Sequence, residues 1–126
     1  MNIELPLFFK SVVDADESAI VLCDINNTIV YMNPSAIKMY ASRGGASLVG
    51  HSIRCYHGED AMSIIKMIAS WFEESPQNNK VFTSHNDEKN IDLYMVALRD
   101  DNGNLIGYYE KHENRNPETK SRYQMD

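Results

Sequence analysis

The residues whose types suggest chemistry lie close together, between His51 and Asp60. His51, Cys55 and His57 fall within seven residues, in the order His-x3-Cys-x-His. Imidazole nitrogens and thiolates are the usual ligands of structural zinc. This spacing matches no standard zinc pattern, however, and no fourth ligand is in view. The sequence therefore predicts no metal site.

Cys55 and His57 also raise the question of nucleophilic catalysis, which needs a nucleophile and a base in contact. No pattern in the sequence brings these two side chains into contact. No asparagine or aspartate is identifiable that would orient the histidine. Gly44-Gly45 alone is a turn and not a phosphate-binding loop. We predict no catalytic residue and do not expect an enzyme.

Composition and charge limit the kinds of partner that the protein can bind. The chain has 126 residues, a net charge of −6 and a pI near 5.1, with its twelve basic residues scattered. Nucleic-acid binding needs clustered basic residues, and a membrane span needs about 20 consecutive apolar residues. The sequence has neither a cluster of basic residues nor such an apolar run, and it shows no secretion signal. With two cysteines, Cys23 and Cys55, the sequence predicts a cytoplasmic protein with reduced thiols.

Apolar residues near the N-terminus follow the spacing of one helix face. They occur at i, i+3, i+4, i+7 and i+8, which predicts an amphipathic helix over residues 1–15. The residues of this face are Leu5, Phe8, Phe9, Val12 and Val13. At the other end, residues 114–126 are charged and nearly free of aliphatic side chains, so we expect a disordered tail.

The segment from Ile20 to Tyr40 predicts two short strands and a capped helix. Residues 20–24 and 28–32 have strand character, and Asn26-Asn27 between them suits a tight turn. Pro34 favours the first position of a helix, and Asn33 can cap its free amides. The chain therefore enters a hairpin and then a helix.

The remaining pattern predicts one further long helix and three strands. The helix covers residues 59–73, and the strands cover 81–85, 91–98 and 105–112, with a turn at Asn102-Gly103. Within 91–98 the alternation places Leu93 and Met95 on one face of the sheet and Tyr94 on the other.

Three segments in this order resemble the PAS domain family. They are DINNTIVYMNPSA from Asp24, LVGHSI from Leu48 and RDDNGNLIG from Arg99. The resemblance covers residues 5 to 113 and implies a stand-alone, single PAS domain over residues 16–113. It implies an α+β fold, with a five-stranded antiparallel sheet, helices on one face and an N-terminal flanking helix.

In this family the sheet and helices enclose a pocket. The residues expected to line it are Leu22, Met32, Ile37, Tyr40, Ile53, Tyr56, His57, Ile65, Ile68, Leu93, Met95 and Tyr108. Seven methionines in a chain of this length suit an adaptable pocket, since the thioether side chain fills irregular gaps. The alternative is that these residues simply pack together and leave no cavity.

The resemblance leaves the cofactor unknown. The segment HGEDAMS from His57 is similar to the C-H-P-P-x-S segment of PAS domains found beside hemerythrin-like modules, which implies His57 as a haem ligand. The favoured alternative is a histidine that caps or hydrogen-bonds the start of the helix. Flavin is not expected, because the N-C-R-F-L-Q motif of light-sensing members is absent.

The function implied by the resemblance is a bacterial sensory or regulatory module in signal transduction. It would bind a small ligand, a protein partner or both, and it would act through an unidentified partner protein. The helix over residues 1–15 is expected to form a homodimer interface, as such helices commonly do in this family. The alternatives are a ligand-free docking scaffold and a haem sensor using His57. The sequence does not identify the ligand.

Overall fold

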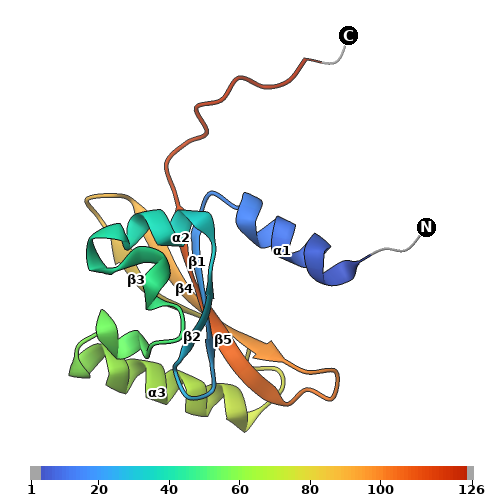
Figure 1. Cartoon of the computed structure of the whole chain (residues 1–126), viewed down its shortest axis with the longest axis vertical. Coiled ribbons are helices and arrows are strands. Elements are labelled where there is room, and N and C mark those ends of the chain that lie inside the picture. Colours follow the sequence, from blue (N-terminus) through green and yellow to red (C-terminus); the bar gives the residue numbers. More distant parts are fainter. Residues whose placement is uncertain (1–3, 125–126) are drawn as a thin grey trace.

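Five antiparallel strands, in the order β2-β1-β5-β4-β3, form the sheet that organises this chain (Figure 1). The computed structural model describes residues 4–124. The helices and strands are α1 (Leu5–Ala15), β1 (Ala19–Asp24), β2 (Ile29–Met32), α2 (Pro34–Met39), α3 (Glu59–Glu74), β3 (Lys80–Asn86), β4 (Ile91–Arg99) and β5 (Leu105–Asn114). Short 3-10 turns at Ala41–Arg43, Gly45–Leu48 and Ile53–Cys55 connect α2 to α3.

The predicted α+β class and the five-stranded antiparallel sheet are confirmed, and several element boundaries shift by one or two residues. The second strand begins at Ile29, and Thr28 closes the turn with Asp24 and forms an isolated bridge with Ser52. The helix that starts at Pro34 ends at Met39. Two 3-10 turns follow it, at Ala41–Arg43 and Gly45–Leu48.

Asn33 joins three elements at the end of the first hairpin. Its side-chain oxygen accepts a hydrogen bond from Ala36 N, as predicted for a helix cap, and a second from Ile20 N, both at 2.9 Å. Its amide group donates to Val13 O at 3.0 Å and Ser18 O at 2.9 Å. This fully buried side chain therefore ties α1, β1 and α2 together.

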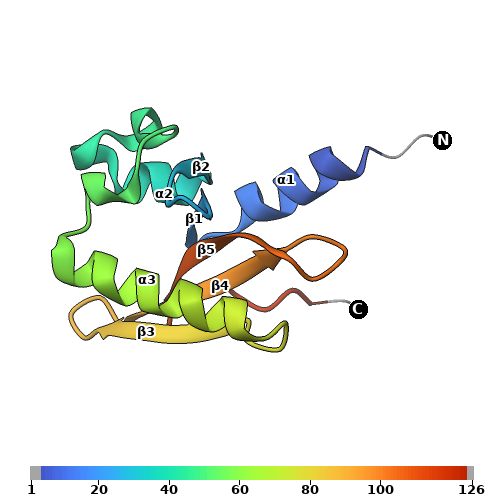
Figure 2. The ribbon, with the colours of Figure 1, turned by 90° about the horizontal axis from the view of Figure 1, so that it is seen from below.

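Alternation along the strands separates an inner and an outer face of the sheet. In β1, Val21 and Cys23 belong to the buried core, while Leu22 does not. The core lies between the inner face and the helices that cover it. Its larger members are Ile29, Met32, Ile53, Met62, Ile65, Ile68, Phe72, Met95 and Tyr108. Figure 2 shows α3 along the β3–β4 part of the sheet and α2 beside β1 and β2.

The final hairpin is fixed at two points. Arg99 donates hydrogen bonds from its guanidinium group to Phe72 O at 2.7 Å and Ser75 O at 3.1 Å, which satisfies carbonyls at the end of α3. Gly107 passes so close to β1 that a Cβ atom there would lie 2.2 Å from Cys23 O. Only glycine fits at that position without moving the strand.

Helix α1 projects away from the sheet (Figures 1 and 2). Of its predicted apolar face, Leu5, Phe8, Phe9 and Val12 are more than half exposed, and Val13 is half-buried. Beyond Asn114, residues 115–124 contain no helix or strand. Residues 1–3 and 125–126, the ends of the predicted helix and tail, lie outside the described residues. None of the helices described has the length and apolar character needed to cross a membrane.

Candidate functional site

A pocket of about 230 Å³ lies between α3 and the inner face of β3, β4 and β5. Its lining residues are His57, Ala61, Ile64, Ile65, Ile68, Thr83, Ser84, Leu93, Met95 and Glu110. Most of this lining is apolar, and the polar atoms come from two hydroxyls, one imidazole and one carboxylate. We call this space the inner pocket.

Many of the residues expected to line a pocket lie in or beside it. His57, Ile65, Ile68, Leu93 and Met95 line the inner pocket directly. Tyr40 and Tyr56 pack against the core. The other four inward-facing residues, Met32, Ile37, Ile53 and Tyr108, lie within the core or against it and do not line this pocket.

Leu22 was placed on the wrong face. It lies on the outer face, in a groove of about 270 Å³ that Val12 and Val13 of α1 share with Tyr109. The reason is the two-residue period of a strand, since Val21 on one side of Leu22 already points into the core.

Glu110 is the charged residue at the centre of the inner face. It is only 3% exposed, and no residue among 4–124 donates a hydrogen bond to either of its carboxylate oxygens. His57 approaches most closely, with Nε2 3.4 Å from Oε1. This distance permits an ion pair but exceeds the roughly 2.7–2.9 Å of a charge-assisted hydrogen bond. The carboxylate is therefore buried and lacks a donor.

Aromatic side chains surround this carboxylate. Tyr56 stacks on Tyr40 with ring centroids 4.5 Å apart and tilts against His57 at 4.6 Å. Tyr40 Oη lies 3.2 Å from His112 Nε2, whereas the buried hydroxyl of Tyr56 has no partner among the described residues. We call Tyr40, Tyr56, His57, Glu110 and His112 the inner polar cluster.

Burial shifts the pKa of three members of this cluster. It raises the pKa of the Tyr56 and Tyr40 hydroxyls, and the negative charge of Glu110 raises both further. Burial also lowers the pKa of His112, although the charge of Glu110 opposes this. Both phenols and His112 are thus neutral near pH 7, and none of them balances a charge on Glu110. Desolvation likewise raises the pKa of the Cys23 thiol to about 12, so it is not a nucleophile.

Sequence reasoning missed five lining residues. They are Ala61, Ile64, Thr83, Ser84 and Glu110. A signal for Glu110 was present, because Tyr108 was expected to point inward and the residue two positions later shares its face. The same period places His112 there as well.

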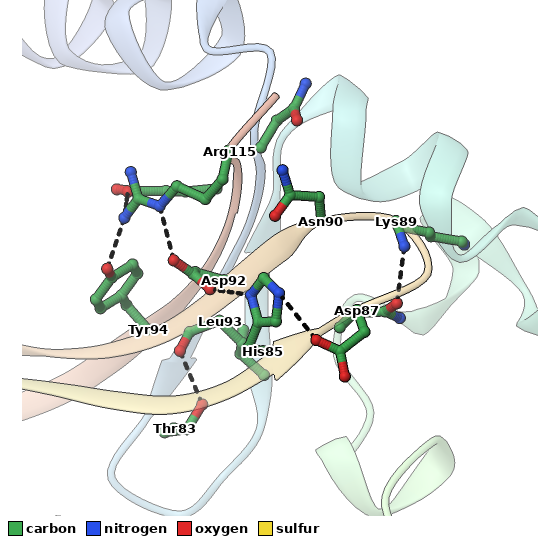
Figure 3. Close-up of polar contacts among 12 residues, drawn as sticks. Thr83, His85, Asp87, Lys89, Asn90, Asp92, Leu93, Tyr94 and Arg115 are labelled. Atoms are coloured by element: carbon green, nitrogen blue, oxygen red, sulfur yellow. Dashed lines mark hydrogen bonds and ion pairs between the residues drawn. The ribbon is translucent and has the colours of Figure 1, made fainter. Parts of the chain in front are cut away.

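A second polar network lies on the outer face, near the β3–β4 turn (Figure 3). His85 Nδ1 contacts one carboxylate oxygen of Asp92, and Arg115 Nε donates to the other at 2.7 Å. Arg115 also donates to Tyr94 Oη at 2.6 Å. The hydrogen bond from Arg115 lowers the pKa of Asp92. We call His85, Asp92, Tyr94 and Arg115 the outer polar cluster.

The residues present do not fit a haem at His57. The inner pocket is smaller than the roughly 300–1,000 Å³ typical for drug-sized ligands, and haem is larger than these. The Glu110 carboxylate also stands 3.4 Å from Nε2, where the iron would bind. Within residues 4–124, no three His, Cys, Asp or Glu side chains are grouped so as to hold a metal ion. Cys55 is exposed and apart from the pocket lining.

Comparison with known proteins finds similarity in structure. No protein-family model and no curated protein matches the sequence. A PAS domain from Colwellia psychrerythraea has a TM-score of 0.63 at 15% identity, covering 88% of this chain and 97% of its own. The PAS domain of Bordetella pertussis BvgS has 0.64 at 13% identity, covering 90% and 88%.

A third similar structure is that of a receptor described with a haem. The Aer2 receptor from Vibrio cholerae, described as a dual PAS-heme oxygen sensor, has a TM-score of 0.53 at 20% identity, covering 79% of this chain and 95% of its own. At such identities the likeness concerns the fold. The strand order, the helices on the inner face and these comparisons together show that the chain has the PAS domain fold.

Proposed function

We propose that this protein is a sensory module in signal transduction that binds a small molecule in the inner pocket. The observation that carries this proposal is the pocket itself, about 230 Å³ of largely apolar space between α3 and the sheet. A fully packed interior would favour a scaffold without a ligand. The PAS fold, found in similar structures that include a receptor, supports a sensory role.

Strand β5 contributes residues to both the inner pocket and the groove on the outer face, so a change at one can reach the other. Glu110 points into the inner pocket, while its neighbours Tyr109 and Lys111 line the groove against α1. Lys111 Nζ also lies 3.1 Å from Asp16, directly after α1. A ligand that shifts β5 would therefore change how α1 rests on the outer face, which an unidentified partner protein would detect.

Toluene is a suitable neutral probe for the pocket. In a full-length sample with labelled methyl groups, we expect toluene to shift the NMR signals of Ile65, Leu93 and Met95. Ala61→Leu fills part of the pocket and should weaken binding by about tenfold, because it removes space for the ring. The matched control is Ala46→Leu, on an exposed 3-10 turn. Absence of methyl shifts, or unchanged binding to Ala61→Leu, would contradict the proposal.

A homodimer through α1 is the second part of the proposal. The apolar side chains of α1 are exposed and continue into the groove that Val12 and Val13 share with the outer face. An exposed apolar surface of this kind typically marks a protein interface. A second copy is the occupant expected here, because its own α1 would offer the same apolar face.

Light scattering on the full chain tests the dimer. We expect twice the monomer mass for the wild type and the monomer mass for Phe9→Glu, since a charge there would be buried in the interface. Met67→Glu, on the exposed side of α3, serves as the control and should remain dimeric. A monomeric wild type, or a dimeric Phe9→Glu variant, would rule out this interface. A dimer that binds no toluene would instead support the docking-scaffold alternative.

A further inference from the structure

The buried carboxylate of Glu110 points to the class of ligand. An ionised carboxylate has two oxygens and about four lone-pair sites. His57 has one nitrogen near Oε1 and can supply at most one donor there. Even with that hydrogen bond formed, Oε2 has no donor among residues 4–124. A buried acid in this state is costly, so it calls for a donor from outside the chain.

The charge of the lining favours a cation. The inner pocket includes one acid and one histidine but no lysine or arginine among its described residues. Lys89 lines a neighbouring pocket with Met39 and Ile91 and does not line the inner pocket. Apart from His57, the titratable group that a cation would meet in the described lining is the carboxylate of Glu110.

The size of the pocket limits the rest of the ligand. About 230 Å³ lies below the roughly 300–1,000 Å³ that accommodates drug-sized molecules. It exceeds the ~150 Å³ of an engineered cavity that holds benzene. The rest of the lining is mainly aliphatic and thioether, with Ile65 on α3 and with Leu93 and Met95 on β4, the strand beside Glu110. A single ring or a short chain with one amino group fits these limits.

We propose that the inner pocket takes a small monocationic amine, whose ammonium group donates hydrogen bonds to both oxygens of Glu110. Its apolar body lies against Ile65, Leu93 and Met95. This inference rests on the proposed function, because it names the ligand class of the same pocket. An ammonium group has three donors, enough for both carboxylate oxygens, and His57 remains free to contact Oε1.

Benzylamine and benzyl alcohol form a matched pair of probes with the same ring and nearly the same size. Their affinities for the full-length protein at pH 7 can be measured from the methyl shift of Met95. We expect benzylamine to bind at least about tenfold more tightly, because a charge-assisted hydrogen bond is stronger than a neutral one. Glu110→Gln should remove this preference. Asp92→Asn removes a carboxylate from the outer polar cluster and should leave the preference unchanged.

The outcomes separate this inference from the proposed function. Equal affinity for the two probes contradicts the amine class, and a preference that survives Glu110→Gln contradicts the contact with Glu110, while toluene binding still supports a ligand pocket in either case. Failure of toluene, benzyl alcohol and benzylamine alike contradicts both proposals. The comparison of the two probes on the wild-type protein stands even where Glu110→Gln does not fold.

Discussion

Two histidine–carboxylate pairs lie on opposite faces of the same sheet and differ in how the chain treats the acid. On the inner face, His57 Nε2 stands 3.4 Å from Glu110, whose side chain is 4% exposed. On the outer face, His85 contacts one oxygen of Asp92 and Arg115 donates to the other at 2.7 Å. Asp92 on the outer face thus accepts a hydrogen bond from Arg115, whereas no residue among 4–124 donates a hydrogen bond to the carboxylate of Glu110 on the inner face.

This difference separates a structural network from the proposed ligand pocket. The outer polar cluster holds Arg115, the first residue after β5, against β4, and its charges remain partly exposed. Exposed ion pairs contribute little to stability and leave nothing unsatisfied. A buried acid without donors lowers stability instead. The proposed amine ligand would account for the buried acid at Glu110, and the outer polar cluster needs no such explanation.

The largest change in stability is expected at Asn33, which ties α1, β1 and α2 together. Asn33→Ala removes the acceptor for Ile20 N and Ala36 N and one donor to each of the carbonyls of Val13 and Ser18, although Val13 O still accepts from Asp16 N. We expect a loss of roughly 2–4 kcal/mol in the free energy of unfolding, measured by urea denaturation, since both hydrogen bonds to Asn33 Oδ1 are buried.

The control for this variant is Asn26→Ala in the exposed turn of the first hairpin, which should change stability by less than about 0.5 kcal/mol. The sequence alone predicts a helix cap worth ~1 kcal/mol at Asn33. A measured loss of that size would mean that the connections to α1 and β1 contribute nothing.

A smaller effect of opposite sign is expected at Glu110. Glu110→Met replaces a buried acid with an apolar side chain of similar length and should raise the free energy of unfolding by roughly 1–3 kcal/mol. Asp92→Asn on the outer face should lower the melting temperature slightly, because it loses the charge paired with Arg115. Thermal melts of both variants test the comparison directly. Destabilisation by Glu110→Met would show that His57 and Glu110 form a stabilising ion pair.

Tyr108 in the core and Tyr56 packed against it extend the same comparison to single hydroxyl groups. Tyr108 Oη donates to Asn27 Oδ1 at 2.9 Å, so Tyr108→Phe should cost about 1 kcal/mol. The hydroxyl of Tyr56 has no partner among the described residues, so Tyr56→Phe should leave stability unchanged or raise it by up to about 1 kcal/mol. Both free energies come from urea denaturation. Equal losses in the two variants would mean that Tyr56 has a donor or acceptor after all.

Local signals explain why the fold was predictable. The turn at Asn26-Asn27, the cap at Asn33 and the hydrophobic period of residues 59–73 each specify structure within a few neighbouring residues. The PAS resemblance then supplied the five-stranded antiparallel sheet with helices on one face. Leu22 was misplaced because a run of apolar residues shows alternation but not which side of the strand is buried.

The candidate site was harder to predict because its residues are distant in sequence. His57 and Glu110 are brought together only when β5 lies between β1 and β4. A glutamate in a strand is ordinarily expected to face solvent, so the charge of Glu110 argued against the inward position that it occupies. Arg115 was assigned to a polar tail, although pairing with Asp92 on β4 places it on the sheet.

The smallest expected effect is a difference in the pH range over which the two faces lose stability. Burial holds the pKa of His112 below its ordinary 6.5, so the unfolded chain binds the proton more readily. The stability contributed by neutral His112 is complete above pH 6.5 and is lost as pH falls through its folded pKa. Arg115 holds the pKa of Asp92 below 3.8, so that contribution is complete above 3.8 and is lost at lower pH.

Melting temperatures between pH 2 and 8 separate these contributions. We expect His112→Gln to reduce the fall that begins below pH 6.5 and to leave the fall below 3.8 in place. Arg115→Ala should do the reverse, because it removes the cause of the lowered pKa of Asp92 and does not touch His112. If Arg115→Ala also removed the loss near pH 6, the two faces would be coupled through the sheet, and the inner and outer clusters would have to be treated as one system.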